Sequence, residues 1–323
     1  MKVSVIIPVY NAALFVTEAV ESSLSQPETA EVILVEDGST DNSLEVCQTL
    51  AAQHDKVVLL QHEGGINKGV SASRNLGLKN TNNKYVAFLD ADDFFLPGRF
   101  SKAEEIFSAN PDCDGVYDAV GSFIQNNHSK QLWEAAGLSI PKLIGMNEVI
   151  APDMLFTQLV CGRSGYLTFC GFVGKLSLFE EAGDFNEKLC YFEDTEYFYR
   201  LSAIGRLCPG KLREPVTLRR IHQSNTVIAP GSTEKKFSDK SKMYISVYRW
   251  LRKKKLYKES GLILRRLMPL YSTVGSNKTG FQNKSLSALR LRFGLFRLII
   301  YLPEAIFSSY YWRRFLPERY WND

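Results

Sequence analysis

Three aspartates stand within four residues, directly after the apolar segment YVAFL at residues 85–89. The carboxylates of Asp90, Asp92 and Asp93 repel one another unless water or a cation lies between them. Hard oxygen ligands of this kind suit Mn²⁺ or Mg²⁺. The same residues also suit a solvated turn that caps the next helix, because aspartate is a good N-cap. The spacing alone leaves both interpretations open.

A second acidic turn, Glu36-Asp37-Gly38, follows the apolar segment at residues 32–35. Gly38 allows a tight turn, and one of the polar residues after it can cap the next helix. That structural role does not explain two acids directly behind a buried strand. A carboxylate there could accept the imide N–H of a uracil or thymine ring. Tyr10, one residue past an earlier apolar segment, could stack on such a base or simply cover the sheet.

A glycine-rich loop at residues 63–69 precedes a short amphipathic segment that carries Arg74. Its three glycines let a backbone approach a ligand closely, and Asn67 lies among them. The loop matches neither a P-loop nor a dinucleotide-binding GxGxxG pattern. Arg74 could pair with a base carbonyl or a phosphate. The alternative is a solvated arginine on a helix face.

The second half of the chain adds acids among aromatic residues and one histidine. Glu193, Asp194 and Glu196 stand in YFEDTEYFY. Carboxylates favour a helix N-terminus, which is the structural interpretation. A carboxylate beside aromatic walls could instead act as a general base on a sugar hydroxyl. His222, in RRIHQSN, could contact a metal or a diphosphate, or be purely structural.

Short apolar segments alternate with amphipathic ones through the first 120 residues. The apolar segments predict buried strands at residues 3–9, 32–35, 57–60 and 85–89, and the others predict helices at 14–24, 43–52 and 71–78. This alternation predicts a parallel sheet with helices on both faces. Ligands bind such sheets beyond the carboxyl ends of the strands. We therefore expect Pro8, Tyr10 and Asn11 to converge with the acidic turns.

The pattern changes after residue 119. Residues 119–165 are less regular, with polar residues scattered among short apolar pieces. Residues 166–175 then predict a strand, 177–182 a short helix and 193–204 a longer one. Beyond residue 233 the pattern predicts basic amphipathic helices.

The composition is that of a folded globular chain. The 323 residues are 45% hydrophobic and 23% charged, which excludes collagen-like, mucin-like and wholly disordered classes. Six cysteines without a CxxC pair indicate neither a zinc site nor a disulfide framework, so we expect reduced thiols in a cytoplasmic protein. The N-terminus lacks a signal-peptide pattern, and no apolar run of about 18 residues predicts a spanning helix.

The order of these motifs resembles glycosyltransferase family 2, the inverting, nucleotide-sugar-dependent enzymes with a GT-A fold. The matching segments are VSVIIPVYN, ILVEDGSTD, NKGVSASRNLGL, YVAFLDADD, GDFNEKLCYFED and RRIHQSN. The resemblance implies an α/β, Rossmann-like fold with a mixed, mainly parallel sheet over residues 1–233. Within it, residues 1–118 would be the nucleotide-binding half and 119–233 the acceptor half, followed by a basic helical region at 234–323. Glu36 and Asn186 stand where aspartates are common, but neither change removes a predicted chemical group.

The same resemblance implies a role for each motif residue. It assigns the nucleotide to Pro8, Tyr10, Asn11, Asp37, Asn67, Arg74, Asp90 and Ala91. It assigns a Mn²⁺ or Mg²⁺ ion to Asp92 and His222, and catalysis to Asp194 as the base with Glu193 beside it. The implied reaction is a single displacement that inverts the anomeric carbon. The donor would be a nucleoside-diphosphate sugar, with UDP favoured over dTDP, and the acceptor a glycan or lipid-linked saccharide.

Two other classes of protein would share parts of this pattern. A nucleotidyltransferase that makes sugar nucleotides would use a similar sheet and metal, but usually has a glycine-rich, basic loop where this chain has PVYN. A non-catalytic scaffold in glycan assembly would keep the fold and tolerate loss of the acids, all of which are present. Release of nucleoside diphosphate, of pyrophosphate, or of neither distinguishes the three classes.

The charge is distributed unevenly along the chain. Up to Glu234 there are 19 basic and 30 acidic residues, net −11, and the last 89 residues carry 20 basic and 5 acidic residues, net +15. One apolar helical stripe in that region is formed by Leu286, Leu289, Phe293, Phe296 and Ile300. A basic, amphipathic helix of this kind suits peripheral docking on an anionic membrane surface. Packing on the acidic domain and homodimer formation are the alternatives, and nothing indicates nucleic-acid binding.

Overall fold

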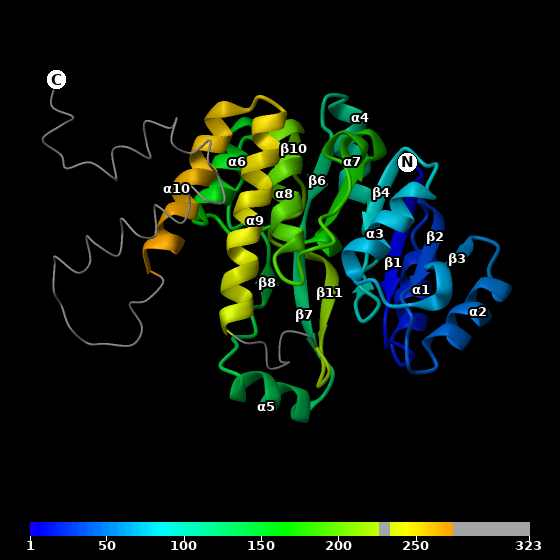
Figure 1. The fold of residues 1–323 in the computed structure, drawn as a ribbon. Coiled ribbons are helices and arrows are strands. Elements are labelled where there is room, and N and C mark those ends of the chain that lie inside the picture. Colours follow the sequence, from blue (N-terminus) through cyan, green and yellow to red (C-terminus); the bar gives the residue numbers. More distant parts are fainter. Residues whose placement is uncertain (226–232, 274–323) are drawn as a thin grey trace, which may run out of the picture. The chain divides into compact units, whose positions relative to one another are not determined.

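The structure, a computed structural model, describes residues 1–225 and 233–273, without the side chains of residues 233–235, 237, 268, 269 and 271–273. The chain divides into two compact units (Figure 1). The first is Met1–Ser232, and the second begins at Thr233. The twelve residues that were predicted to bind the nucleotide or the metal or to act in catalysis lie in the first unit.

A seven-stranded sheet forms the centre of the first unit, in the order β10-β6-β9-β4-β1-β2-β3. Its strands are β1 (Val3–Val9), β2 (Thr29–Glu36), β3 (Val57–Gln61), β4 (Tyr85–Phe88), β6 (Gly115–Tyr117), β9 (Phe172–Lys175) and β10 (Leu207–Pro209). Neighbouring strands are parallel, except that β9 runs antiparallel to both β4 and β6. The prediction of a mixed, mainly parallel sheet is confirmed.

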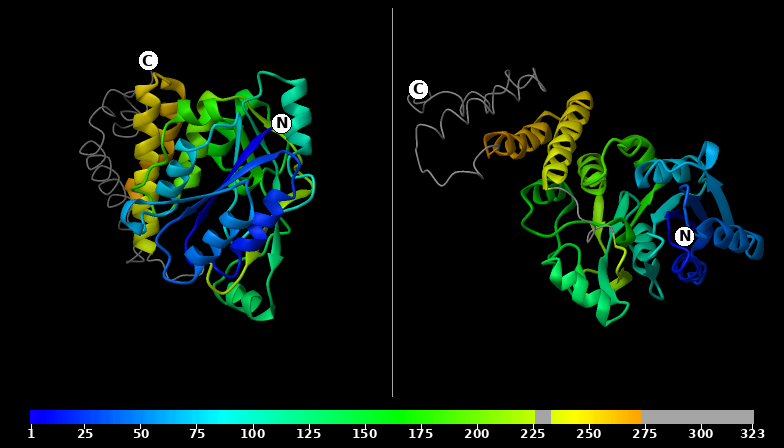
Figure 2. Two further views of the ribbon diagram at one scale, coloured as in Figure 1. Left: turned by 90° about the vertical axis from the view of Figure 1, so that its right-hand side faces the viewer. Right: turned by 60° about the horizontal axis from the view of Figure 1, so that its bottom comes forward.

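Helices cover both faces of this sheet, because its central strands are buried on both sides. Alternate residues of β1, from Val3 to Val9, join a core cluster with residues of α1, α2 and α4. Ile6 faces the other side and meets α3, where a Cβ at Gly77 would lie 2.4 Å from the Ile6 side chain. The helices of this unit are α1 (Val16–Leu24), α2 (Ser43–Gln53), α3 (Val70–Lys79), α4 (Ser101–Ala109), α5 (Asn127–Ala135), α6 (Pro152–Cys161), α7 (Leu176–Ala182) and α8 (Glu193–Ile204) (Figures 1 and 2).

Pro8 stands in the central strand without breaking the sheet. A proline cannot donate a ladder hydrogen bond, so it is usually confined to positions without a partner. The pairing of β1 with β4 ends at Ile6, while the pairing with β2 continues to Val9. Pro8 therefore stands two residues after Ile6, the last residue paired with β4. At this point β1 and β4 separate, and Pro8 lines a cavity between them.

Residues 119–165 are more regular than the sequence pattern indicated. They contain β7 (Ala119–Ile124) and β8 (Leu143–Ile144), as well as α5 and α6. With β5 (Phe94–Phe95) and β11 (Pro215–Ile221), these strands form a second sheet in the order β5-β11-β7-β8. A two-residue strand is too short to show an alternating pattern. The sequence did carry a signal for helix α6. Pro152 stands at its first position, and Gly162, which has a φ of +65°, directly follows its last residue.

The predicted strand at residues 166–175 was wrong in its first half. The strand β9 begins only at Phe172, after a 3₁₀ turn, η2, at Phe169–Gly171. Gly171 passes close to a neighbouring backbone, because a Cβ there would lie 2.6 Å from the carbonyl oxygen of Asp118. The turn lets Phe169 stack on Phe198, with ring centroids 4.4 Å apart. A packing requirement between distant residues therefore overrode the local strand pattern.

The second unit contains the helices α9 (Thr233–Lys253) and α10 (Tyr257–Thr273), which lie side by side (Figures 1 and 2). Their connection reverses at Lys255, which has a φ of +62°. The N–H of Leu256 donates to the carbonyl of Leu251, as in a Schellman motif. No helix in the described ranges is long and apolar enough to cross a membrane. The stripe from Leu286 to Ile300, on which the membrane prediction depends, lies outside the described residues.

A buried ion pair joins the two sheets of the first unit. Arg99 Nη1 lies 3.0 Å from Asp118 Oδ2, and both side chains are almost completely buried. Asp118 Oδ1 also accepts the backbone N–H of Lys211, at 2.7 Å. Burial raises the pKa of Asp118, and the adjacent Arg99 opposes that rise. Asp118 stands between β6 and β7, so this pair fixes the point where the chain passes from one sheet to the other.

We predict that Arg99→Met lowers the free energy of unfolding by about 3–5 kcal/mol, because it leaves the Asp118 carboxylate buried without its cation. The double variant Arg99→Met, Asp118→Asn should recover part of that loss. Urea-induced unfolding monitored by circular dichroism measures both. A loss below about 1 kcal/mol in the single variant would mean that the pair does not hold this junction.

Candidate active site

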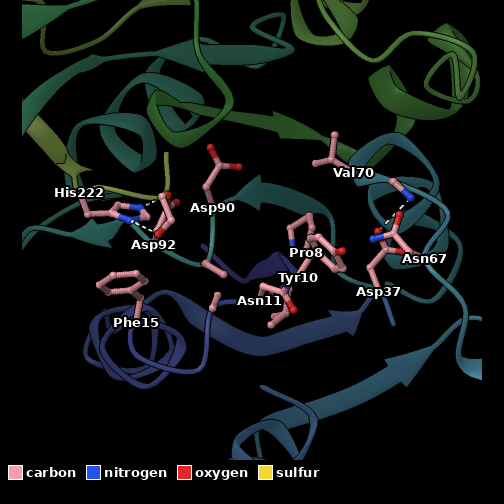
Figure 3. Close-up of a pocket in the computed structure, with 15 residues that line it drawn as sticks. Pro8, Tyr10, Asn11, Phe15, Asp37, Asn67, Val70, Asp90, Asp92 and His222 are labelled. Carbon is pink, nitrogen blue, oxygen red and sulfur yellow. Dashed lines mark hydrogen bonds and ion pairs between the residues drawn. The ribbon is translucent and has the colours of Figure 1, made fainter. Parts of the chain in front are cut away.

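A cavity of about 540 Å³ lies at the carboxyl ends of β1, β2 and β4 (Figure 3). Nine of the twelve predicted site residues line it: Pro8, Tyr10, Asn11, Asp37, Asn67, Asp90, Ala91, Asp92 and His222. Residues that the sequence did not single out complete the wall, among them Phe15, Val70 and Ser224. Parallel strands therefore bring these residues to one edge, as the βαβ pattern predicted.

The cavity has two chemically different ends. Asp37 and Asn67 lie at one end and Asp92 and His222 at the other, with Tyr10 among the residues between them (Figure 3). Tyr10 is 50% exposed, so one face of its ring is available for stacking. An extended ligand with a flat ring at one end and anionic groups at the other would fit this order of side chains.

Asp37 holds the glycine-rich loop against the sheet. Its carboxylate oxygens accept the backbone N–H groups of Lys68, at 2.7 Å, and Gly69, at 2.9 Å. His62 Nε2 lies 3.4 Å from the same carboxylate. Each oxygen of a carboxylate has two lone pairs, so Asp37 keeps acceptor capacity toward the cavity. Its role is thus partly structural, and it is this role that brings Asn67 to the cavity wall.

Glu36, the other acid of this turn, faces the turn itself. It accepts the N–H of Ser39 at 2.6 Å and a hydrogen bond from Gln61 at 3.2 Å. Burial acts to raise the pKa of Glu36, but these hydrogen bonds outweigh it and hold the pKa below its ordinary value. Glu36, the last residue of β2, and Asp37, which follows it, therefore both accept hydrogen bonds that fix the local backbone.

The opposite end of the cavity joins residues 130 positions apart. His222 Nε2 lies 2.9 Å from Asp92 Oδ2, and His222 Nδ1 lies 2.9 Å from Ser224 Oγ. A carboxylate of Asp92 accepts from Nε2–H, while a hydroxyl such as that of Ser224 can either donate to Nδ1 or accept from it. The ring of Phe15 packs on the imidazole, with centroids 4.5 Å apart. These contacts fix the orientation of both Asp92 and His222.

Asp93 turns away from this cavity. It is buried, its Oδ1 accepts the backbone N–H of Arg220 at 2.8 Å, and Cys170 Sγ lies 3.4 Å from its Oδ2. Burial, followed by the nearby charges of Asp92 and Asp90, raises the pKa of Asp93 well above its ordinary value. Of the three aspartates after β4, Asp93 is therefore the structural one.

Two sets of side chains could hold a metal ion. Asp90, Asp93 and Cys170 place one potential ligand atom each within 4.8 Å of the others. Burial raises the pKa of the Cys170 thiol well above its ordinary value, so the sulfur stays protonated and does not suit a hard cation. Asp90 and Asp92 are 47% and 30% exposed in the cavity beside His222. This oxygen-rich set fits Mn²⁺ or Mg²⁺ better.

Arg74 does not line the large cavity, although it was predicted to contact the nucleotide. It lies instead in the wall of a second cavity, of about 170 Å³, which shares Asp90 with the first. Its guanidinium contacts Asp90 Oδ1 at 3.1 Å and Glu193 Oε1 at 3.4 Å, and it lies 5.1 Å from the ring centre of Phe169. Arg74 thus links the end of β4 to the start of α8.

The predicted acidic pair begins α8, and Asp194 lines the second cavity. Phe192 precedes the pair with a φ of +64°, a conformation that is strained for a bulky residue. Asp194 Oδ1 accepts the backbone N–H of Thr195 at 2.6 Å. Burial and the charge of Asp194 raise the pKa of Glu193 from 4.5 to about 7, and Arg74 opposes that rise.

Sequence reasoning missed several residues that hold the site together. Arg220 and Asn225 both hydrogen-bond around Asp92, and both stand in the segment RRIHQSN that drew attention only to its histidine. Arg219, Tyr166 and Thr168 line the second cavity. The doublet of arginines before His222 was a usable signal, because two adjacent cations in a buried strand require partners.

Known proteins share the fold and part of the sequence. Residues 4–164 match the family model described as glycosyl transferase family 2. An uncharacterized glycosyltransferase of Rickettsia felis is 47% identical over 163 residues, which are 48% of this chain and 26% of that protein. The minor teichoic acid biosynthesis protein GgaB of Bacillus subtilis is 39% identical over 108 residues, 32% of this chain and 12% of that protein. The chain thus spans at most 26% of the length of either relative.

A solved structure extends the likeness over most of the chain. The structure of S. aureus TarS 1–349 in complex with UDP-GlcNAc has a TM-score of 0.64 at 18% identity, and the match covers 95% of this chain and 83% of that chain. At this identity the likeness supports the fold alone, and it confirms the predicted GT-A type. Because the family model, the glycosyltransferase relatives and the fold agree, the chain belongs to glycosyl transferase family 2.

Proposed function

We propose that this chain is an inverting glycosyltransferase that moves a sugar from a nucleoside-diphosphate donor to a hydroxyl group of a glycan or lipid-linked saccharide. The observation that carries the proposal is that Asp90 lies in the walls of both cavities. One cavity offers Tyr10, Asp92 and His222 to a nucleotide, and the other offers Asp194 to an acceptor. A sugar near Asp90 would lie between them.

The donor would occupy the large cavity. The base would lie near Asp37 and Asn67, stacked on Tyr10, and the diphosphate near Asp92 and His222. A bound Mn²⁺ or Mg²⁺, held by Asp90 and Asp92 with His222 beside them, would neutralise charge on the departing diphosphate. The UDP-GlcNAc held by TarS supports a UDP-sugar donor and, with it, transfer of a hexosyl or N-acetylhexosaminyl group.

Asp194 is the proposed general base. Its Oδ1 is held by Thr195, whereas its Oδ2 accepts no hydrogen bond from any described residue. Asp194 Oδ2 can take the proton from the acceptor hydroxyl while the hydroxyl oxygen of the acceptor attacks the anomeric carbon. Glu193 and Arg74 do not touch this oxygen, but they set the charge around it. Attack from the side opposite the diphosphate inverts the configuration.

We predict that Asp92→Ala abolishes turnover that depends on Mn²⁺, because it removes an oxygen ligand and the partner of His222. Nucleoside diphosphate release from a UDP-sugar panel is the measurement, with Mn²⁺ affinity measured separately by calorimetry. Asp112→Ala, at an exposed acid outside both cavities, is the matched control. Unchanged metal dependence in Asp92→Ala would remove this residue from the metal site.

Asp194→Asn keeps the shape of the side chain but cannot accept the proton. We expect kcat to fall by roughly 10²–10⁴ while the donor Kd stays unchanged. Single-turnover kinetics together with UDP titration separate the two quantities. A collapse of donor affinity, with little change in the rate of bound donor, would make Asp194 a binding residue instead.

The raised pKa of Glu193, about 7, predicts a pH dependence of kcat/KM. Above that pH Glu193 loses its proton, and the added negative charge makes Asp194 a stronger base. The rate should therefore rise through an inflection near pH 7, and Glu193→Gln should remove this inflection. A pH profile of identical shape for Glu193→Gln and the wild type would contradict the assignment of the inflection to Glu193.

A further inference from the structure

The side chain of Arg219, in the wall of the second cavity, forms no ion pair with a described residue, although its charge acts on the nearby Asp93 and Tyr166. Arg219 is half-buried on β11, and its side chain makes no hydrogen bond with the described residues. Arg74, the other guanidinium of this cavity, already contacts Asp90 and Glu193. A half-buried guanidinium with unused donors is costly in free energy unless a ligand or water satisfies it.

The strand geometry directs Arg219 differently from its neighbour. Successive side chains of a strand point to opposite faces, so Arg219 and Arg220 diverge. Arg220 donates hydrogen bonds to Gln125 and Glu18, neither of which lines the second cavity. Arg219 instead lies over the indole of Trp133, with its guanidinium carbon 5.5 Å from the ring centre.

Trp133 gives Arg219 a fixed platform. The indole is buried, and its Nε1 donates to the carbonyl of Ser139 at 3.0 Å. A cation–π contact with this buried, hydrogen-bonded ring favours one position of the guanidinium before any ligand arrives. Such preorganisation reduces the entropy that binding costs. The planar fork of an arginine matches a carboxylate or a phosphate, each of which can accept two parallel hydrogen bonds.

We propose that the second cavity binds an acceptor that carries a negatively charged group, a phosphate or a carboxylate, held by Arg219 while the acceptor hydroxyl faces Asp194. This inference rests on the proposed glycosyl transfer, because it takes Asp194 as the base. Arg219 does not line the first cavity, where the donor diphosphate is placed. A neutral sugar would offer the guanidinium of Arg219 no anionic hydrogen-bond partner.

The acids of the second cavity limit where the anionic group can bind. Asp90 repels the anionic group from the end of β4, and Asp194 repels it from the start of α8. The carboxylate of Asp93 already accepts from Arg220 and lies against Cys170. Tyr166 and Thr168 line the same cavity and can donate hydroxyl hydrogen bonds to the ligand. The anionic group is therefore confined to the side of the cavity that β11 contributes.

Equilibrium binding tests the proposal without requiring the natural acceptor. The probes are glycerol 3-phosphate and methyl glucuronide, with glycerol and methyl glucoside as their neutral counterparts. They are titrated by ligand-observed NMR into protein saturated with UDP and Mg²⁺, so that the diphosphate position is filled. Wild type is compared with Arg219→Gln and with Arg213→Gln, an exposed arginine outside both cavities.

We expect at least one anionic probe to bind wild type more tightly than its neutral counterpart, and Arg219→Gln to weaken that binding by about 10- to 100-fold. Arg213→Gln should leave it unchanged. The probe that binds distinguishes a phosphate from a carboxylate.

Equal affinities for charged and neutral probes, or for wild type and Arg219→Gln, would overturn the inference. A loss of UDP affinity in Arg219→Gln would also overturn it, since the arginine would then serve the donor diphosphate. A wild-type protein that fails to bind UDP at all would overturn the proposed function itself, and with it the acceptor role of this cavity.

Discussion

The buried guanidinium of Arg220 is the interaction on which the geometry of the site depends. Its Nε donates to the carbonyl of Asp92, its Nη1 to Gln125 and its Nη2 to Glu18, while its backbone N–H donates to Asp93. The rings of Phe15, Phe94 and Phe123 surround it at 5.1–5.3 Å. One residue of β11 thus ties the turn that carries Asp92 and Asp93 to α1 and β7. Desolvating a guanidinium is unfavourable, so loss of any one acceptor would loosen the whole turn.

The acidic motifs of the site share one physical solution to the repulsion between neighbouring carboxylates. In each motif at least one acid holds the local structure, and at least one lines a cavity. Glu36 and Asp93 accept backbone N–H groups, while Asp37 and Asp92 line the large cavity. At the start of α8, Glu193 contacts Arg74, and Asp194 lines the second cavity. Backbone N–H donors and arginine side chains thus stabilise closely spaced carboxylates that would otherwise repel one another.

The sequence predicted whatever depends on local pattern. Alternating apolar and amphipathic segments predicted the parallel strands, and the rule for strand ends placed Tyr10, Asp37 and Asp92 around one cavity. The bend at Phe169–Gly171 and the position of Arg74 could not be predicted in this way. Both depend on aromatic packing between η2 and α8, which joins residues far apart in the chain. The second sheet escaped notice because β5 and β8 are only two residues long and because its strands pair across distant parts of the chain.

The shared wall between the cavities also explains why the pKa of Glu193 is raised to about 7. Arg74 is the cation placed between two acids, at 3.1 Å from Asp90 and 3.4 Å from Glu193. One guanidinium cannot compensate both carboxylates fully, and Glu193 is the more buried, with Asp194 beside it. The uncompensated charge therefore appears as a raised pKa on Glu193, whereas Asp90 is paired with Arg74 and lines both cavities. The same arginine thus sets the charge at the point where donor and acceptor would meet.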